Sequence, residues 1–281
     1  MKYTLLLCTL DRQKELDFCL KSLMNQTYEN FEIIVVDQSE GDYSQKYGSI
    51  QKLRYIHITE KGLSNARNVG LGVANSDYTC LIDDDAVYPL DWLEKVNSVL
   101  STSEMDFLCG YLEDPNTHRK SVPTRYLKRV DVKFKKAMVY CISPACVVKT
   151  SYLQLMRFDE RFGVGRQWGA GEETDLVWRL IYKKARVVFD PSIVVFHKVA
   201  PKSDLPEDKL YKYNVGFGAL FKKHLLEYPS IDVLLFIVCS IGRNIAGIIV
   251  YWIKKDKLNQ IRQRICLTGK LAGLKEYREN H

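Results

Sequence analysis

The sequence predicts an α/β fold built on a mostly parallel central sheet flanked by helices, and three observations predict it. Short apolar runs alternate with amphipathic stretches of helical period along the first hundred residues. The run FEIIVV is rich in β-branched residues and has no polar face, which is typical of a strand covered on both sides. Aspartates follow two of the runs directly. Strands and helices in alternation give a parallel sheet with right-handed crossovers.

The first half of the chain supplies most of the expected elements. A helix over 13–26 is predicted by a stripe of Leu16, Leu20, Leu23 and Met24 at helical spacing. A second helix, over 63–75, turns Ala66, Val69 and Val73 inward, and a third is expected over 91–100. The expected strands are 3–8, 31–39, 53–58 and 78–83.

The second half is more mixed in pattern. FLCGYL (107–112) reads as a strand and is followed by a polar, basic loop over 113–136. We expect a strand, a turn and a strand over 137–150, an amphipathic helix over 173–184, and two strands over 185–198. This organisation suggests one domain over 1–228, with halves of about 1–112 and 113–228.

Composition and charge exclude several classes of protein. The 281 residues are 46% hydrophobic and 27% charged, which is enough for a packed core and argues against disorder. The eight cysteines form no CxxC or zinc spacing, so we expect reduced, buried thiols in the cytoplasm. The N-terminal apolar run is too short for a signal sequence. No nucleic-acid-binding signature accompanies the net charge of +7, so no nucleic-acid partner is expected.

The C-terminal segment 229–281 differs from the rest of the chain. Residues 231–253 are almost wholly apolar and long enough to cross a bilayer, but Arg243 and Asn244 fall in the middle. The following stretch has eight Lys and Arg against three acids, with Leu258 and Ile261 among its apolar residues. We interpret the pair as helices that dock in the plane of a membrane. A true span, and an ordinary docked helix or oligomer contact, stay open as alternatives.

Carboxylates gather where predicted strands end. Asp37 follows one strand, and Asp83, Asp84 and Asp85 follow another. Because ligands of open parallel sheets bind beyond the carboxyl ends of the strands, these side chains should share one edge. Mg²⁺ or Mn²⁺ with phosphate oxygens would neutralise them. The plainer alternative is that the three aspartates cap helix 91–100 and line a solvated loop.

Other residues could complete a site for phosphates. Thr9 and Arg12 lie just beyond the first strand, on the same edge by topology. The segment GLSNARNVG (62–70) opens a helix whose N-terminus favours anions, and Arg67 could add a guanidinium fork to a phosphate or to a strand-end aspartate. Arg67 taken alone would more plausibly be a surface arginine.

A second acidic cluster lies in WGAGEETDLVWRL (168–180). Glu172, Glu173 and Asp175 open the predicted helix, where one of them suits a capping role and another could act as a general base. His197 ends a strand and becomes a metal-ligand candidate only because of the proposed metal nearby. Trp168 could stack on an acceptor sugar or belong to the core.

Six segments in order resemble the inverting nucleotide-sugar glycosyltransferases of family 2, which have the GT-A fold. They cover about residues 1–200, and each is weak alone. They are TLDR (9–12), VVDQS (35–39), KGLSNARNVGL (61–71), LIDDDAVYP (81–89), FDERFGVGRQWGAGEETDLVWRL (158–180) and VVFHK (194–198).

The resemblance implies roles for most of these residues. Thr9, Arg12 and Asp37 would hold the base and ribose. Asp83 and Asp85 would be the DxD pair that contacts ribose and Mn²⁺ or Mg²⁺, with Asp84 beside them and His197 as a further metal ligand. Glu173 would be the catalytic base. Apart from the resemblance, Trp168 and Asp175 are candidate acceptor contacts. Where the family usually has Glu-Asp, this chain has Glu172 and Glu173, so either could be the base.

The implied function is transfer of a sugar from a nucleotide-sugar donor to a glycan or polyprenyl-linked glycan, in bacterial cell-surface polysaccharide synthesis. The enzyme would work as a peripheral protein on the cytoplasmic face of the membrane. Two alternatives are a nucleotidyltransferase, against which the lack of glycine in TLDRQKE argues, and a non-catalytic nucleotide-sugar-binding protein, against which the acids at 172–175 argue.

Overall fold

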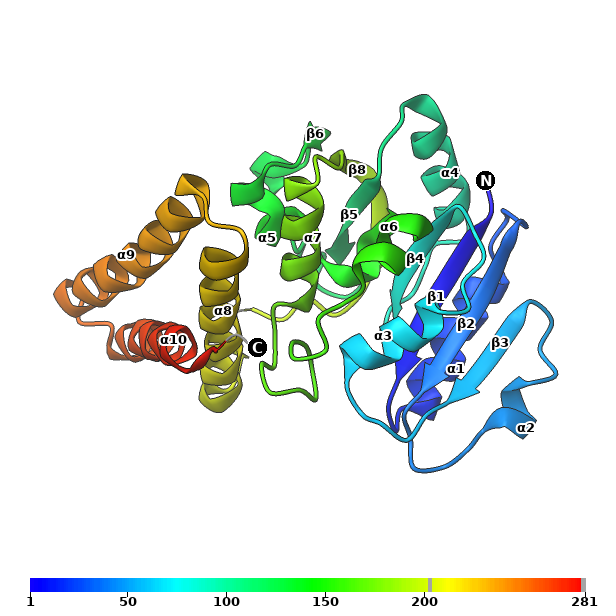
Figure 1. The fold of residues 1–281 in the computed structure, drawn as a ribbon, viewed down its shortest axis with the longest axis horizontal. Helices are drawn as coiled ribbons and strands as arrows, with labels where there is room; N and C mark the ends of the chain where they lie inside the picture. Colours follow the sequence, from blue (N-terminus) through cyan, green and yellow to red (C-terminus); the bar gives the residue numbers. More distant parts are fainter. Residues whose placement is uncertain (202–203, 279–281) are drawn as a thin grey trace. The chain divides into compact units, whose positions relative to one another are not determined.

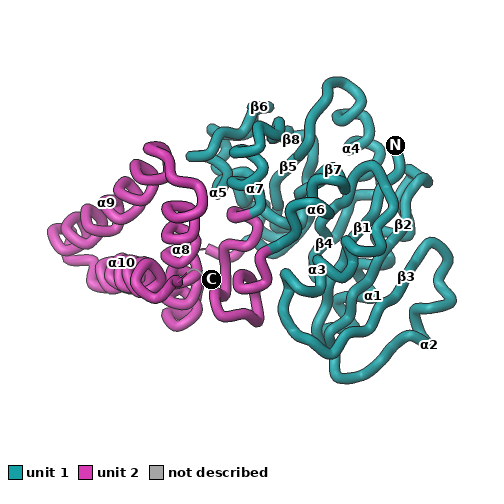
Figure 2. Tube along the Cα trace, in the orientation of Figure 1, with its two compact units in different colours: residues 1–158, 176–199 teal, residues 159–175, 200–281 magenta. Residues whose placement is uncertain are grey.

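The computed structural model describes residues 1–201 and 204–278, which fall into two compact units. Unit 1 comprises Met1–Phe158 and Leu176–Val199, and unit 2 comprises Asp159–Asp175 and Ala200–His281 (Figure 2). The segment before residue 176 therefore groups with the C-terminal helices. The domain bounds expected from the sequence, at residues 112 and 228, stay a prediction.

Unit 1 is built on one eight-stranded sheet. The mostly parallel sheet flanked by helices that the sequence predicts is confirmed (Figure 1). Its strands stand in the order β3-β2-β1-β4-β7-β5-β8-β6, with β1 to β4 mutually parallel and β7 antiparallel to both of its neighbours. The strands are β1 (Tyr3–Thr9), β2 (Phe31–Asp37), β3 (Leu53–His57), β4 (Tyr78–Asp83), β5 (Phe107–Glu113), β6 (Val130–Asp131), β7 (Cys146–Lys149) and β8 (Val187–Phe196).

Alternate residues of the central strands face opposite layers of helices. Leu5, Leu7 and Ile33 share a core with the buried side chains of α1 (Gln13–Met24) and α4 (Trp92–Thr102). The opposite face meets α3 (Leu63–Leu71), where a Cβ on Gly70 would lie 2.2 Å from Leu6 Cδ1. Glycine thus lets α3 lie close against the sheet. The remaining helices that enter unit 1 are α2 (Ser44–Tyr47), α5 (Ala137–Tyr140), α6 (Thr150–Met156) and part of α7 (Glu172–Tyr182).

Two expectations for the second half of the sheet are wrong. Residues 137–150 form α5, a 3-10 turn at Ser143–Ala145 and the single strand β7, instead of two strands. Residues 187–196 form one strand, β8, whose pairing with β5 shifts register between Cys109 and Tyr111. A Cβ on Gly110 would lie 2.0 Å from the Ile193 carbonyl oxygen, so only glycine admits this irregularity. The expected loop 113–136 contains β6 and two further 3-10 turns, Thr124–Tyr126 and Phe134–Lys136.

Unit 2 contains three long helices, α8 (Glu207–Glu227), α9 (Ile231–Ile253) and α10 (Lys257–Glu276). Helix α8 was not predicted, because its sequence has no continuous apolar stripe. Its backbone lies against that of α10, since a Cβ on Gly273 would lie 2.0 Å from the Val215 carbonyl oxygen. The expected C-terminal helices are present.

Helix α9 has two unlike faces. Val233, Ile237, Ser240 and Asn244 recur at three and four residues and are buried. Lys270 of α10 donates to Ser240 Oγ at 3.0 Å and to Asn244 Oδ1 at 2.7 Å, so the polar residues of α9 lie toward α10. By length and composition α9 could cross a membrane, and only 22% of its most apolar window is buried.

Candidate active site

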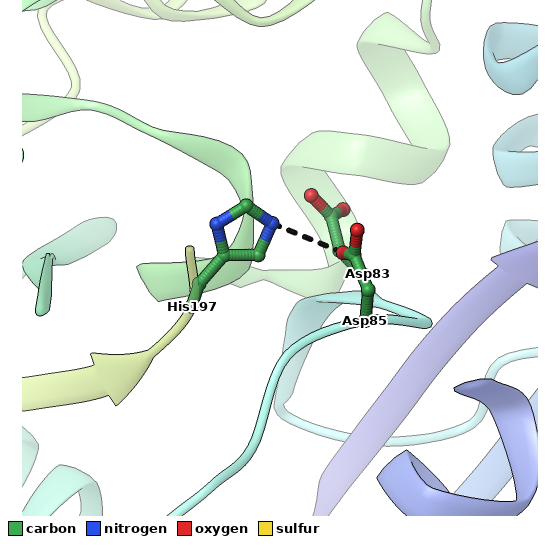
Figure 3. A group of neighbouring side chains, drawn as sticks. All are labelled: Asp83, Asp85 and His197. Atoms are coloured by element: carbon green, nitrogen blue, oxygen red, sulfur yellow. Dashed lines mark hydrogen bonds and ion pairs between the residues drawn. The ribbon is translucent and has the colours of Figure 1, made fainter. Parts of the chain in front are cut away.

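Three candidate metal ligands meet beyond the carboxyl edge of the sheet, within unit 1 (Figure 3). Asp83 ends β4, Asp85 lies in the turn that follows, and His197 comes directly after β8. One ligand atom from each lies within 4.8 Å of the others. Asp85 and His197 are 112 positions apart in the sequence, and paired backbone hydrogen bonds between Val87 and Phe196, of 2.8 and 2.9 Å, bring them together.

The histidine is oriented as a metal ligand usually is. His197 Nδ1 lies 2.8 Å from the Lys198 carbonyl oxygen and can donate its hydrogen there. That bond directs Nε2 toward Asp85, whose Oδ1 is 3.0 Å away. A ring nitrogen fixed on a backbone carbonyl is a common support for metal-binding histidines, because it leaves the other nitrogen to face the ion.

The surroundings of Asp83 and Asp85 shift their pKa values in opposite directions. The hydrogen bond from His197, with a second from Arg12, holds the pKa of Asp85 well below its ordinary value. Partial burial, together with the charge of Asp85, raises the pKa of Asp83 to about 6 despite Arg67. The hydrogen bond to Asp85 raises the pKa of His197. Two carboxylates that lie close together repel each other, and a cation bound between them stabilises their charged forms.

Arg12 and Thr9 hold the middle aspartate. The Arg12 guanidinium spans two carboxylates, with 2.7 Å from Nη1 to Asp84 Oδ1 and 2.8 Å from Nη2 to Asp85 Oδ2. Thr9 Oγ1 donates to the other Asp84 oxygen at 2.7 Å. Asp84 itself is buried, and this burial raises its pKa. Asp84 therefore ties the end of β1 to the end of β4, while Arg12 stays half-exposed.

Arg67 is a buried residue and not a surface arginine. Its side chain is 2% exposed, lies 3.6 Å from Asp83 Oδ1 and donates to Ser143 Oγ. The guanidinium also stacks on Phe158, 5.1 Å from the ring centroid. These contacts orient Asp83, so Arg67 supports the acidic cluster from behind.

Asp37 lies beside the first strand end, in register with Thr9. It is fully buried and accepts hydrogen bonds from the Ser39 backbone at 2.8 Å, from the Ser39 hydroxyl at 2.5 Å and from the Tyr55 hydroxyl at 2.8 Å. In this arrangement Asp37 shapes the loop after β2.

The two candidate bases open helix α7 in unit 2. Gly171, with φ of +104°, lets the chain turn sharply into the helix at Glu172. Glu172 is 6% exposed, whereas Glu173 is partly exposed. The more accessible carboxylate of the pair is thus the one that the resemblance marks as the base.

The two expected acceptor contacts are buried. Trp168 is 4% exposed and packs near Tyr277, with ring centroids 6.2 Å apart. Asp175 is fully buried and accepts from Lys223 Nζ at 2.8 Å and from His224 Nε2 at 2.9 Å. Both side chains lie within the core of unit 2, and the acceptor role expected for them stays a prediction.

The sequence reasoning missed the residues that hold Asp175. Lys223 also lies 2.7 Å from Asp159 Oδ2, and Arg161 makes two bonds to Asp159 at 3.0 and 2.7 Å. Asp159 and Arg161 belong to FDERF (158–162), which is part of a segment that resembles the family, so the sequence could have indicated them. No sequence pattern indicates Lys223 and His224, because α8 is mixed in composition.

The residues present fit a divalent ion. Two carboxylates and one imidazole leave room for diphosphate oxygens in the coordination shell. Carboxylates suit Mg²⁺ and Mn²⁺, and the nitrogen ligand favours the transition ion Mn²⁺.

Sequence comparisons relate the chain to known glycosyltransferases. A profile described as Glycosyl transferase family 2 matches residues 4–161. An uncharacterized glycosyltransferase of Haemophilus influenzae is 32% identical over 117 residues, 39% of this chain and 36% of that protein. The glucosyl-dolichyl phosphate glucuronosyltransferase of Haloferax volcanii is 31% identical over 102 residues, 34% of this chain and 32% of that protein. The chain thus spans about a third of the length of the curated relatives it matches.

Solved structures show the fold. A mannosyltransferase from Pyrobaculum calidifontis, in complex with GDP-Man and Mn²⁺, is 15% identical with a TM-score of 0.65, covering 97% of this chain and 87% of that one. S. aureus TarS 1-349, in complex with UDP-GlcNAc, is 15% identical with a TM-score of 0.58, covering 100% of this chain and 93% of that one. With a family profile matched over more than half its length and a GT-A sheet that carries the acidic cluster at its carboxyl edge, the chain belongs to glycosyl transferase family 2.

Proposed function

We propose that the chain is a metal-dependent, inverting glycosyltransferase that moves one sugar from a nucleotide-sugar donor to a hydroxyl of a glycan or polyprenyl-linked glycan. The single observation that carries this proposal is the convergence of Asp83, Asp85 and His197 at the carboxyl edge of a family 2 sheet. The neighbours in complex with GDP-Man and Mn²⁺ and with UDP-GlcNAc support a donor of this class. Relatives from Haemophilus influenzae and Bacillus subtilis that are named as glycosyltransferases support the transferase activity, and cell-surface polysaccharide synthesis is the role that we propose for it.

Residues at the strand ends would hold the donor. Asp83, Asp85 and His197 would bind Mn²⁺ or Mg²⁺, which when bound supplies positive charge against the leaving diphosphate. Arg12 is half-exposed, so it can turn from the carboxylates to the nucleotide. Thr9 and Asp37, paired in register, would frame the base and ribose, and Arg67 would keep Asp83 aimed at the site.

Glu173 would act on the acceptor. Its carboxylate takes the proton of an acceptor hydroxyl, and the oxygen forms a bond to the anomeric carbon. The bond from that carbon to the diphosphate oxygen breaks, and the nucleoside diphosphate leaves with the electron pair. Because the hydroxyl attacks the face opposite the leaving group, one displacement inverts the anomeric configuration. Glu172 is the less exposed of the two carboxylates and suits a structural role.

The C-terminal helices would place the protein on the cytoplasmic face of a membrane. The side of α9 opposite the buried stripe exposes apolar residues, among them Leu234, Val238 and Ile249. Lys270 bonds to the polar residues of α9, and a spanning α9 would draw that cation toward the hydrocarbon. The stretch 254–281 has a positive excess of five, which complements anionic lipid headgroups. A helix lying in the membrane plane satisfies both observations.

Product analysis tests the proposed reaction. The purified chain would be incubated with UDP-, GDP- and dTDP-sugars carrying a ¹³C label at the anomeric carbon, with bacterial lipid extracts as acceptor source. We expect one donor to release its nucleoside diphosphate with Mn²⁺ and not with chelator, and the labelled product to show an inverted anomeric carbon. Retained configuration would contradict the mechanism. Metal-dependent nucleotide binding with no transfer would indicate a non-catalytic binding protein.

A further inference from the structure

Unit 2 contains a cavity of about 700 Å³ that the site described above does not use. One wall is the loop that leads to α7 and includes Arg166, Gln167 and Gly169. The other is the start of α8, with Tyr211 and Tyr213 among its residues. The volume falls within the range of about 300–1,000 Å³ that is usual for small-molecule sites.

The lining mixes hydrogen-bond donors, acceptors and aromatic faces. Arg166, Lys209 and Lys212 bring cations, while Asp208 and Glu276 bring carboxylates. Gln167 adds an amide, which both donates and accepts, and the two tyrosines add ring faces with hydroxyls. A saccharide needs this combination, because its hydroxyls donate and accept and its C–H faces pack on aromatic rings. Three cations against two carboxylates leave the lining close to neutral, so it does not favour a polyanion.

The loop wall is held in place by backbone hydrogen bonds and by one buried side chain. The Gly163 backbone donates to the Trp168 carbonyl at 2.8 Å, and the Trp168 backbone donates to the Arg161 carbonyl at 2.9 Å. The buried Trp168 anchors the loop, and Arg166 lies 3.7 Å from Glu160. On the opposite wall Lys209 Nζ lies 5.5 Å from the Tyr213 ring centroid. The loop wall is therefore fixed by its backbone bonds and by Trp168, and the other wall is one side of the regular helix α8.

The cavity wall continues into the helix that carries the proposed base. Gly169 lines the cavity and stands three residues before Glu172. Between them, Ala170 lies against α8, because a Cβ on Gly216 would be 2.7 Å from its carbonyl oxygen. One wall of the cavity and Glu173 therefore belong to the same short stretch of chain, which packs against α8.

We propose that this cavity is a subsite for a saccharide unit of the acceptor, distinct from the donor residues at the strand ends. The proposal rests on the proposed transferase function and names the part of the acceptor that the chain recognises. Tyr211 and Gln167 are the side chains expected to contact the sugar, the first by its ring face and the second by its amide.

Binding to a printed array of oligosaccharides tests the subsite. The array would carry neutral, uronate-containing and phosphate-containing oligosaccharides, and the full chain would be applied without nucleotide. We expect the wild type to bind a subset of the sugars, and Tyr211→Ala and Gln167→Ala to weaken that binding by about tenfold or more. Tyr211 is 41% exposed, so its removal should not unfold the helix. Lys222→Ala, on the same helix outside the cavity, is the matched control and should bind as the wild type does.

Calorimetric titration of the same wild-type preparation with nucleoside diphosphates and Mn²⁺ separates the two ways of failing. Nucleotide binding without any sugar binding would overturn the subsite and leave the proposed function standing. Sugar binding that both cavity variants retain would also overturn the subsite. No nucleotide binding would overturn the proposed function itself, whatever the array shows.

Discussion

Lys223 of α8 and Asp175 of α7 form an ion pair inside unit 2, with Nζ 2.8 Å from Oδ1 and neither side chain more than 4% exposed. His224 Nε2 shares the same oxygen at 2.9 Å, and Lys223 reaches Asp159 at 2.7 Å. Asp175 stands two residues after Glu173 on the first turn of α7. The pair therefore fixes the turn on which the proposed base lies.

Replacing Lys223 should destabilise the protein strongly. Lys223→Met removes the positive charge that neutralises the buried carboxylates of Asp175 and Asp159. Breaking a buried ion pair in this way lowers the free energy of unfolding by about 3–5 kcal/mol. Urea unfolding would measure the loss. Lys222→Met, the adjacent and more exposed lysine, should change stability by less than about 0.5 kcal/mol. Equal midpoints for the two variants would mean that the buried pair contributes nothing to stability.

Exchanging each α7 glutamate for glutamine should identify the base. Glu173→Gln keeps the size of the side chain and removes the proton acceptor, so turnover should fall at least about 10²-fold while donor affinity stays unchanged. Glu172→Gln is the matched control and should keep most of the turnover. Steady-state release of nucleoside diphosphate measures both. If Glu172→Gln is inactive and Glu173→Gln is active, the assignment of the base is wrong.

Removing a metal ligand should abolish metal-dependent donor binding. Asp85→Ala takes away one carboxylate of the cluster and the partner of His197 and Arg12. Asp91→Ala removes a half-exposed aspartate of the same unit, which pairs with Lys95 at the surface, and should bind as the wild type does. The measurement is nucleotide affinity with Mn²⁺ and with chelator. A Mn²⁺ effect of normal size in Asp85→Ala would rule out its ligand role.

Charging the exposed face of α9 should release the protein from membranes. Val238 and Ile249 are 58% and 52% exposed. Burying each in lipid is worth about 1.5–3 kcal/mol, so Val238→Glu with Ile249→Glu should weaken binding at least about 10²-fold. Flotation with vesicles of phosphatidylglycerol and phosphatidylcholine measures this. Leu155→Glu, an exposed apolar residue of unit 1, is the control. Wild-type protein that stays in the aqueous fraction would refute the docking proposal.

The sequence predicts the strand ends well, because periodicity and topology are local and regular. Seven of the eight strands overlap expected runs, and parallel order alone brings Thr9, Asp37 and Asp83 to one edge. His197 could be named as a metal-ligand candidate because it ends a predicted strand near the proposed metal, and the structure places its Nε2 3.0 Å from Asp85 Oδ1. The short strand β6 was not predicted, because two residues within a polar loop are too few to show an alternating pattern.

The buried ion cluster of unit 2 could not be predicted, for a physical reason. The composition of α8 does not predict that Lys223 and His224 are buried. Their burial is favourable because of tertiary contacts with Asp175 and Asp159. The same holds for Arg67, which as a lone arginine suggests the surface. Its burial follows from Asp83, Ser143 and Phe158, which come from three different parts of the chain.

Calorimetric titration of the wild-type chain with UDP, GDP and dTDP, each with Mn²⁺ and with chelator, tests the central claim most directly. If Asp83, Asp85 and His197 hold a metal that binds a nucleoside diphosphate, one nucleotide should bind with Mn²⁺ and lose that binding with chelator. Equal affinity with and without Mn²⁺ would contradict the metal role, and no binding of any of the three would contradict the donor site itself.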